Sequence, residues 1–226
     1  SSAASDVYKR QDYTVAYSKN KNIGKATVTV TFKGNYSGSK KLNFNILPAA
    51  TSKIIVKQTT SSITASWKKV AGVSGYRVYL YKGKKLAKCV DTTKRTLTFK
   101  KLSKGTGYKI VVKAYKTIDG KKSLSLVSKE LLTATKLSAP TSVKVKAGKK
   151  RAIISWTKDK SANSYTVYYS TKKDSGFKKL TVIKNSADIQ KLTSGKTYYF
   201  KVVANKKVGK AAVASDFSKL VSAKIK

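Results

Sequence analysis

Few residues in this chain of 226 could carry acid–base, nucleophilic or metal chemistry. Histidine is absent, which excludes Ser-His-Asp triads, histidine general bases and histidine-ligated zinc. The single cysteine, Cys89, can form neither an internal disulfide nor a Cys–His nucleophile pair. One glutamate, Glu130, and eight aspartates leave little for paired-carboxylate chemistry, and no aspartate cluster has the spacing of a calcium loop. We therefore predict no catalytic residue, no metal ligand and no cofactor, and we do not expect this fragment to be an enzyme, although a longer protein could carry a catalytic domain.

Glycine-lysine stretches could in principle form a phosphate-binding loop. Gly-Lys-Lys occurs at residues 83–85, 120–122 and 148–150. Each stretch lacks the second glycine and the following helix that a phosphate loop needs. We predict that all three are hairpin turns.

Aromatic and cationic side chains form the only arrangement with binding potential. By strand alternation, one set of tyrosines should face solvent, interleaved with Arg77, Lys109, Lys113 and Lys201. These tyrosines are Tyr79, Tyr81, Tyr115, Tyr168 and Tyr199. Exposed rings beside cations could stack on sugars or hold anionic polymers. The alternative is cross-strand pairing over lysine stems, which stabilises an exposed sheet by about 0.2–1 kcal/mol per pair.

The charge of the chain is strongly positive and evenly spread. Fifty basic residues oppose nine acidic ones, for a net charge of +41. Residues 1–50, 51–137 and 138–226 contribute +6, +18 and +17. Only four basic residues are arginine, whose planar fork suits base and phosphate readout better than the hydrated lysine ammonium. We therefore expect a solvated surface with a diffuse attraction to anionic polymers, and we do not expect specific nucleic-acid binding.

An internal repeat organises most of the chain. Six pairs of residues recur at a spacing of 89 or 90, which suits a small domain repeated in tandem. The pairs are Trp67/Trp156, Tyr76/Tyr165, Leu102/Leu192, Gly105/Gly195, Tyr108/Tyr198 and Ala114/Ala204. Within each copy apolar residues alternate with polar ones, as in Ile63, Ala65 and Trp67, and no helical stripe competes. This pattern predicts an all-β protein with two β-sandwiches, at residues 48–137 and 138–226.

The repeated motifs resemble those of fibronectin type III domains. The resemblance covers residues 51–137 and 138–226 and rests on a Trp on the second strand, Tyr-x-Val on the third, and Leu-x-x-Gly-x-x-Tyr leading to Val-x-Ala. It implies that Trp67 and Trp156 pack in the cores. It also implies that Tyr108 and Tyr198 form tyrosine corners, with each hydroxyl bonded to nearby upstream backbone. The integrin-binding Arg-Gly-Asp of some family members is absent from the corresponding loops, residues 117–121 and 206–210.

The N-terminal part of the chain differs from the repeat. Residues 12–47 contain three predicted strands, Tyr13–Tyr17, Ala26–Phe32 and Lys41–Ile46. Their motifs, including Gly-Asn-Tyr-Ser-Gly, resemble the C-terminal half of an immunoglobulin-like repeat of bacterial surface proteins, so we expect a truncated module. Residues 1–11 match, codon by codon, the translation of a common sequencing adapter, so we exclude them from the fold. If these residues are not native, the lack of a signal peptide in this sequence is not informative about secretion.

These features favour a structural and not a catalytic role. We expect a monomeric, non-catalytic spacer of a larger bacterial secreted or cell-surface protein, located outside the cell or in the cell wall, with weak affinity for anionic wall polymers. An alternative is a carbohydrate-binding accessory region of a secreted polysaccharide- or peptidoglycan-degrading enzyme. A third is a basic nucleic-acid binder. No apolar run reaches the length of about 18–20 residues that spans a bilayer.

Overall fold

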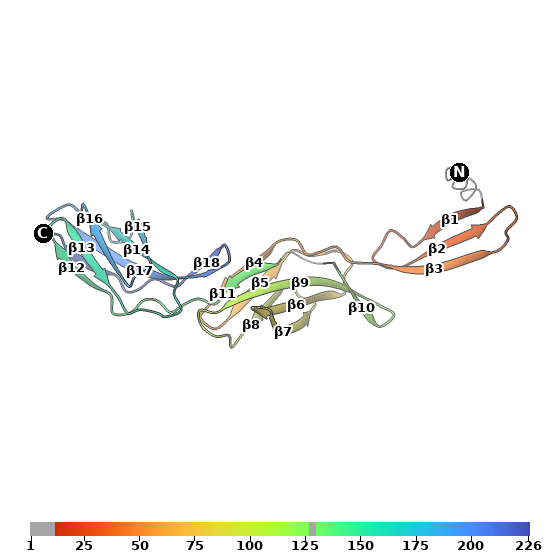
Figure 1. Cartoon of the computed structure of the whole chain (residues 1–226), viewed down its shortest axis with the longest axis horizontal. Helices are drawn as coiled ribbons and strands as arrows, with labels where there is room; N and C mark the ends of the chain where they lie inside the picture. The colour runs from red at the N-terminus through yellow and green to blue at the C-terminus, as the bar shows by residue number, and fades with distance from the viewer. Residues whose placement is uncertain (1–11, 127–129) are drawn as a thin grey trace, which may run out of the picture.

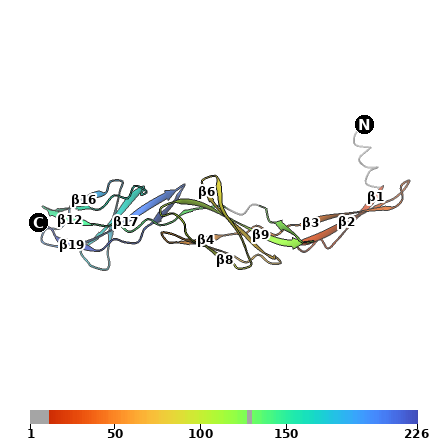
Figure 2. The ribbon, with the colours of Figure 1, turned by 90° about the horizontal axis from the view of Figure 1, so that it is seen from below.

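The protein is built from three successive β units in an extended arrangement. The computed structural model describes residues 12–126 and 130–226. All regular secondary structure within these residues is β-strand. Figures 1 and 2 show the three units one after another along the long axis, with the C-terminus at the opposite end from the N-terminal unit. The predicted adapter-derived segment, 1–11, lies outside the described residues.

The N-terminal unit is a single antiparallel meander of three strands. They are β1 (Tyr13–Ser18), β2 (Gly24–Phe32) and β3 (Ser39–Ile46), in the order β1-β2-β3. The register places alternate apolar residues of all three strands on one face, opposite a mainly polar face. On that face Val28 and Val30 of the central strand are half-buried, and six large apolar side chains are 39–60% exposed: Tyr13, Val15, Tyr17, Phe32, Leu42 and Phe44. Of the hydrophobic side chains in these strands only Ala26 is buried, so the unit has an open apolar face and no core of its own.

The first repeat copy is a sandwich of two antiparallel sheets. A three-stranded sheet has the order β4-β5-β8, and its strands are β4 (Ile54–Gln58), β5 (Ile63–Trp67) and β8 (Thr96–Phe99). A five-stranded sheet has the order β10-β9-β6-β7, with β11 also paired to β9. Its strands are β6 (Gly75–Lys82), β7 (Lys85–Thr92), β9 (Gly107–Ile118), β10 (Lys121–Leu124) and β11 (Leu131–Ala134).

The second copy repeats this architecture strand for strand. Its smaller sheet, β12-β13-β16, contains β12 (Lys144–Gly148), β13 (Arg151–Ser155) and β16 (Ser186–Gln190). Its larger sheet, β15-β14-β17-β18 with β19 paired to β17, contains β14 (Ser164–Ser170), β15 (Lys178–Val182), β17 (Thr197–Val208), β18 (Ala211–Ala214) and β19 (Val221–Lys224). The predicted all-β fold with two tandem sandwiches is confirmed. The three Gly-Lys-Lys stretches lie at the β6–β7, β9–β10 and β12–β13 turns.

Each sandwich has a core centred on its tryptophan. Trp67 is 5% exposed and Trp156 is 3% exposed. Each indole meets a tyrosine ring at an angle, Tyr76 at 5.4 Å and Tyr165 at 5.2 Å between centroids. The hydroxyl of each of these tyrosines accepts a backbone N–H bond from six residues upstream, at 2.9 Å in the first copy and 2.7 Å in the second. These hydrogen bonds therefore hold the loop before β6 and the loop before β14 against the core. The sequence pattern does not assign this role to the two tyrosines.

The predicted tyrosine corner is present in one copy and missing in the other. The Tyr198 hydroxyl accepts the backbone N–H of Thr193 at 3.2 Å, and hydrogen bonds from Thr193 lower the pKa of Tyr198. The Tyr108 side chain is buried, but its hydroxyl makes no hydrogen bond within the described residues. In this copy the turn is held by the buried Thr135, whose hydroxyl donates to the Ser103 carbonyl at 2.6 Å and accepts the Thr106 N–H at 3.0 Å. The expectation for Tyr108 is therefore corrected.

Hairpins of the larger sheets meet the preceding unit at both joints. At the first joint, the carboxylate of Asp119 in the β9–β10 turn forms an ion pair with the Lys25 ammonium, at 3.1 Å. At the second, the β17–β18 turn packs on β11 and the start of β9. A Cβ added to Gly209 would lie 2.8 Å from Leu132, and one added to Gly107 would lie 3.0 Å from Val208. These are the turns that correspond to the adhesion loop of the family, and here they lie against the neighbouring unit.

Candidate functional site: aromatic and cationic sheet faces

In the first sandwich the predicted face lies on β6 and β9. Tyr79 and Tyr81 point to the same side of β6, with their ring centroids 6.3 Å apart and the planes nearly parallel. The Lys109 ammonium lies 4.9 Å from the centre of the Tyr81 ring. Burial raises the pKa of Tyr79, and both tyrosines are only partly exposed. Both rings are therefore only partly accessible to solvent.

Most cations of this first face are already paired with carboxylates. Arg77 donates to both oxygens of Asp91, at 2.7 and 2.9 Å, and Lys122 also contacts Asp91. Lys109 pairs with Glu130 at 2.8 Å. The Arg77 hydrogen bond holds the pKa of Asp91 well below its usual range, and Asp91 in turn raises the pKa of Arg77. Local carboxylates therefore offset much of the positive charge beside Tyr79 and Tyr81.

Tyr115 does not belong to the exposed face, contrary to the prediction. It lies near the end of β9 and is only 7% exposed. Its ring crosses Gly75, because a Cβ added there would lie 2.7 Å from the tyrosine hydroxyl. The Lys122 ammonium lies 4.9 Å from the centre of the same ring. The alternation identifies the side of the sheet correctly, but a glycine on the neighbouring strand lets the ring fold down onto the sheet.

In the second sandwich a denser cluster surrounds Tyr168 on β14. The register places Tyr168 between Lys179 on β15 and Lys201 on β17. The Lys179 ammonium lies 5.2 Å from the centre of the Tyr168 ring. Phe217 meets the Tyr168 ring edge-on at 5.0 Å. The Lys201 ammonium lies between two phenyl rings, 4.2 Å from Phe177 and 4.1 Å from Phe217.

We call Tyr168, Phe177, Lys179, Lys201 and Phe217 the Lys201 cluster. Neither lysine of the cluster has an ion pair within the part of the chain that the structure describes. The predicted site residue Tyr199 lies on the same strand as Lys201, is half-buried and makes no ring contact within those residues.

Sequence reasoning missed the two phenylalanines. Phe177 lies before β15, and Phe217 lies between β18 and β19, so neither is part of an alternating strand pattern. No sequence signal places them beside Lys201. Their position follows from the fold, which brings the segment before β15 and the segment between β18 and β19 to Lys201 on β17.

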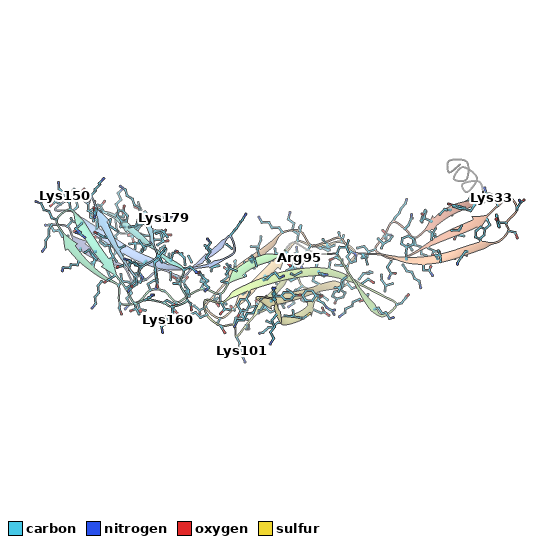
Figure 3. The ribbon with its side chains drawn as sticks, in the orientation of Figure 1. Lys33, Arg95, Lys101, Lys150, Lys160 and Lys179 are labelled. Carbon is cyan, nitrogen blue, oxygen red and sulfur yellow. The ribbon has the colours of Figure 1, made fainter. Side chains whose placement is uncertain are left out.

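The described residues contain no cluster of three or more His, Cys, Asp or Glu that could hold a metal ion. Cys89 is a free, exposed thiol on β7, opposite Tyr79. Among the same residues, no helix long and apolar enough to cross a membrane is found. Figure 3 draws the side chains of the described residues, and the six basic residues that it labels come from all three units: Lys33, Arg95, Lys101, Lys150, Lys160 and Lys179.

Comparison with known proteins identifies the family. The sequence model of the fibronectin type III domain matches residues 48–129 and 138–218, more than half of the chain. The chain therefore belongs to the fibronectin type III family, whose domains serve in general as extracellular spacer or interaction modules.

Two solved structures illustrate the similarity. The FN1–FN3 domains of chicken CNTN1 are 18% identical, with a TM-score of 0.43, over 89% of this chain and 78% of that one. A two-domain fibronectin type III segment from chicken tenascin is 21% identical, with a TM-score of 0.40, over 76% of this chain and 97% of that one. No curated protein sequence matches the chain.

Proposed function

We propose that this chain is a stiff, non-catalytic spacer of a larger bacterial secreted or cell-surface protein, with weak affinity for anionic wall polymers. The observation that supports a spacer most strongly is the joint between the two sandwiches. Nine residues, 135–143, separate β11 from β12, the first strand of the second module. A short link whose neighbours pack against each other leaves the second module fewer orientations than a long flexible linker would.

Polar contacts of the link add to the hairpin contacts at this joint. Lys136 pairs with Asp216 of the second module at 2.6 Å, and Lys104 approaches Asp159 at 3.7 Å. Exposed ion pairs of this kind contribute little stability on their own. The apolar contact of the β17–β18 turn with β11 does not depend on salt, and we expect it to hold the joint.

We further propose that residues 12–47 are the truncated end of an immunoglobulin-like module. The open apolar face of β1, β2 and β3 supports this reading, because a sheet with one apolar face is normally covered by a second layer. In each of the two complete modules a three-stranded sheet provides that cover. Strands from an upstream part of the full-length protein would serve the same purpose here.

The weak polymer affinity follows from the charge. With +18 and +17 on two modules of similar length, the field attracts polyanions without a defined arginine-lined site. Such binding releases counterions and weakens steeply as salt rises. The Debye length of about 8 Å at physiological ionic strength leaves little of this attraction.

A carbohydrate-binding accessory region is the second candidate function. The nearly parallel Tyr79 and Tyr81 rings are the observation that favours it, because flat pairs of rings can stack on neutral sugars. In that case a neutral glycan should bind in a salt-resistant way, and Tyr79→Ala with Tyr81→Ala should remove the binding.

Small-angle X-ray scattering of the full chain tests the spacer. We expect the maximum dimension to stay constant between about 50 and 300 mM salt, where ion pairs weaken but apolar contacts persist. Insertion of four Gly-Ser residues after Ser138 is the control, since such linkers behave as flexible coils. If the distribution of interatomic distances from the wild-type chain were as broad as that from the insertion variant, the stiff spacer would be refuted.

A further inference from the structure

The two sandwich faces differ in how their cations are balanced. In the first sandwich Arg77, Lys109 and Lys122 all contact carboxylates. The positions that correspond to Lys201 and Lys179 of the second sandwich are occupied there by Val111 and Cys89. In the second sandwich both positions carry lysines. Among the described residues these lysines contact aromatic rings and form no ion pair with a carboxylate.

Aromatic rings position a lysine without neutralising it. A ring quadrupole attracts a surface ammonium but carries no net charge. The Lys201 ammonium lies 4.2 Å from the centre of the Phe177 ring and 4.1 Å from that of Phe217. These two contacts favour one position of the ammonium on the sheet. Less side-chain entropy is then lost when an anion binds, compared with a freely moving surface lysine. The cluster therefore presents a preorganised cation within an apolar, aromatic setting.

The aromatic surface continues beyond the cluster. Phe217 is 47% exposed, and besides contacting Tyr168 it lines a hollow of about 610 Å³. The rest of the lining comes from the link and the start of the second module, residues 139–143, and from residues 218–221. Lys219 is the only charged residue in the lining, and no acidic residue is present. A ligand in this hollow would therefore contact Phe217 and reach Lys219, a third cation.

We propose that the Lys201 cluster and the adjoining hollow form a binding site for an anionic, carboxylate-bearing polysaccharide. The C–H faces of the sugar rings would pack on Phe217 and Tyr168, and the carboxylates would meet Lys201 and Lys179. The combination of rings and unpaired cations selects this ligand, because a neutral sugar would leave the lysines unused and a flexible acidic peptide would leave the rings unused. The proposal rests on the polyanion affinity of the proposed function and confines its strongest part to the second module.

Binding of polygalacturonate to the full chain at about 50 mM salt tests the site. The probe variant is Lys179→Gln with Lys201→Gln, and the matched control is Lys109→Gln with Lys122→Gln in the first module. Each pair removes two charges, so a diffuse field predicts equal losses. We expect the probe variant to lose about 5–20-fold in affinity, from surface pairs worth up to about 1 kcal/mol each. The control variant should change by less than about twofold.

The aromatic part of the site is tested separately. Phe217→Leu retains apolar packing but removes the ring, and it should weaken polygalacturonate binding about 3–10-fold while the circular dichroism melt stays close to wild type. Polyglutamate is the comparison ligand, since it has carboxylates but no sugar ring, and we expect it to bind more weakly and to be insensitive to Phe217→Leu.

Three outcomes would overturn the site. The first is equal loss of affinity in the probe and control lysine variants. The second is equal binding of polyglutamate and polygalacturonate in wild-type protein, and the third is preferential binding of DNA. The first two leave the spacer and its diffuse field intact, and the scattering experiment can fail independently, so the two proposals are separable.

Discussion

The two tyrosine corners give a matched pair of substitutions within one chain. Tyr198→Phe removes a hydroxyl that accepts the Thr193 N–H at 3.2 Å, whereas Tyr108→Phe removes a hydroxyl with no hydrogen bond among the described residues. The net contribution of such a bond is about 0.5–1.5 kcal/mol. We expect Tyr198→Phe to destabilise the second module by about 1 kcal/mol and Tyr108→Phe to leave the first nearly unchanged.

The chain supplies its own probes for this experiment. Trp67 and Trp156 are the only tryptophans, one in each core, so two indole N–H signals in a nitrogen-15 NMR spectrum report the two modules separately. In a urea titration, a module with a slope near 1 kcal/mol per molar should shift its midpoint by about 1 M for a loss of 1 kcal/mol. Equal shifts from both substitutions, or none from Tyr198→Phe, would refute the assignment of the corner to the second module alone.

Other substitutions probe the cores, the charge pairs and the joint. Trp67→Ala and Trp156→Ala should each cost about 3–5 kcal/mol of unfolding free energy by calorimetry, because each removes a buried core ring. Because the folded-state pKa of Asp91 is depressed, its stabilisation is complete above about pH 5 and is lost as the pH falls, so Asp91→Asn should flatten the acid side of the pH–stability profile of the first module. Gly105→Ala should lower the melting temperature more than Gly195→Ala, since both have positive φ but only the Cβ at 105 meets Leu137, at 2.4 Å.

The cores were predictable because strand alternation has a strict period of two. The repeat places Trp67 and Trp156 at equivalent points, and burial of one implies burial of the other. The corners were less predictable, because a single hydroxyl in a different place changes the hydrogen bonding of a turn. Thr135 takes over the turn before Tyr108, and no repeat spacing identifies it.

The candidate site was only partly predictable. Alternation predicts Tyr79, Tyr81 and Tyr168 on the outer face, where the structure has them half-buried. It cannot tell whether a ring stands away from the sheet or lies across a neighbouring glycine, as Tyr115 does. Phe177 and Phe217, whose rings contact the Lys201 ammonium, lie in irregular segments, where no periodic pattern predicts their position. Charge pairing is equally invisible along the sequence, since the partner of Arg77 is 14 residues away.

The stiffness of the joint between the sandwiches is the central claim, and a distance distribution tests it most directly. The exposed native Cys89 carries one spin label, and Lys146→Cys on β12 provides an exposed site for a second. Electron–electron double resonance should give one narrow distance distribution for the native link and a broad one for the Gly-Ser insertion after Ser138. A native distribution as broad as that of the insertion variant would show that the modules move independently and would contradict the spacer.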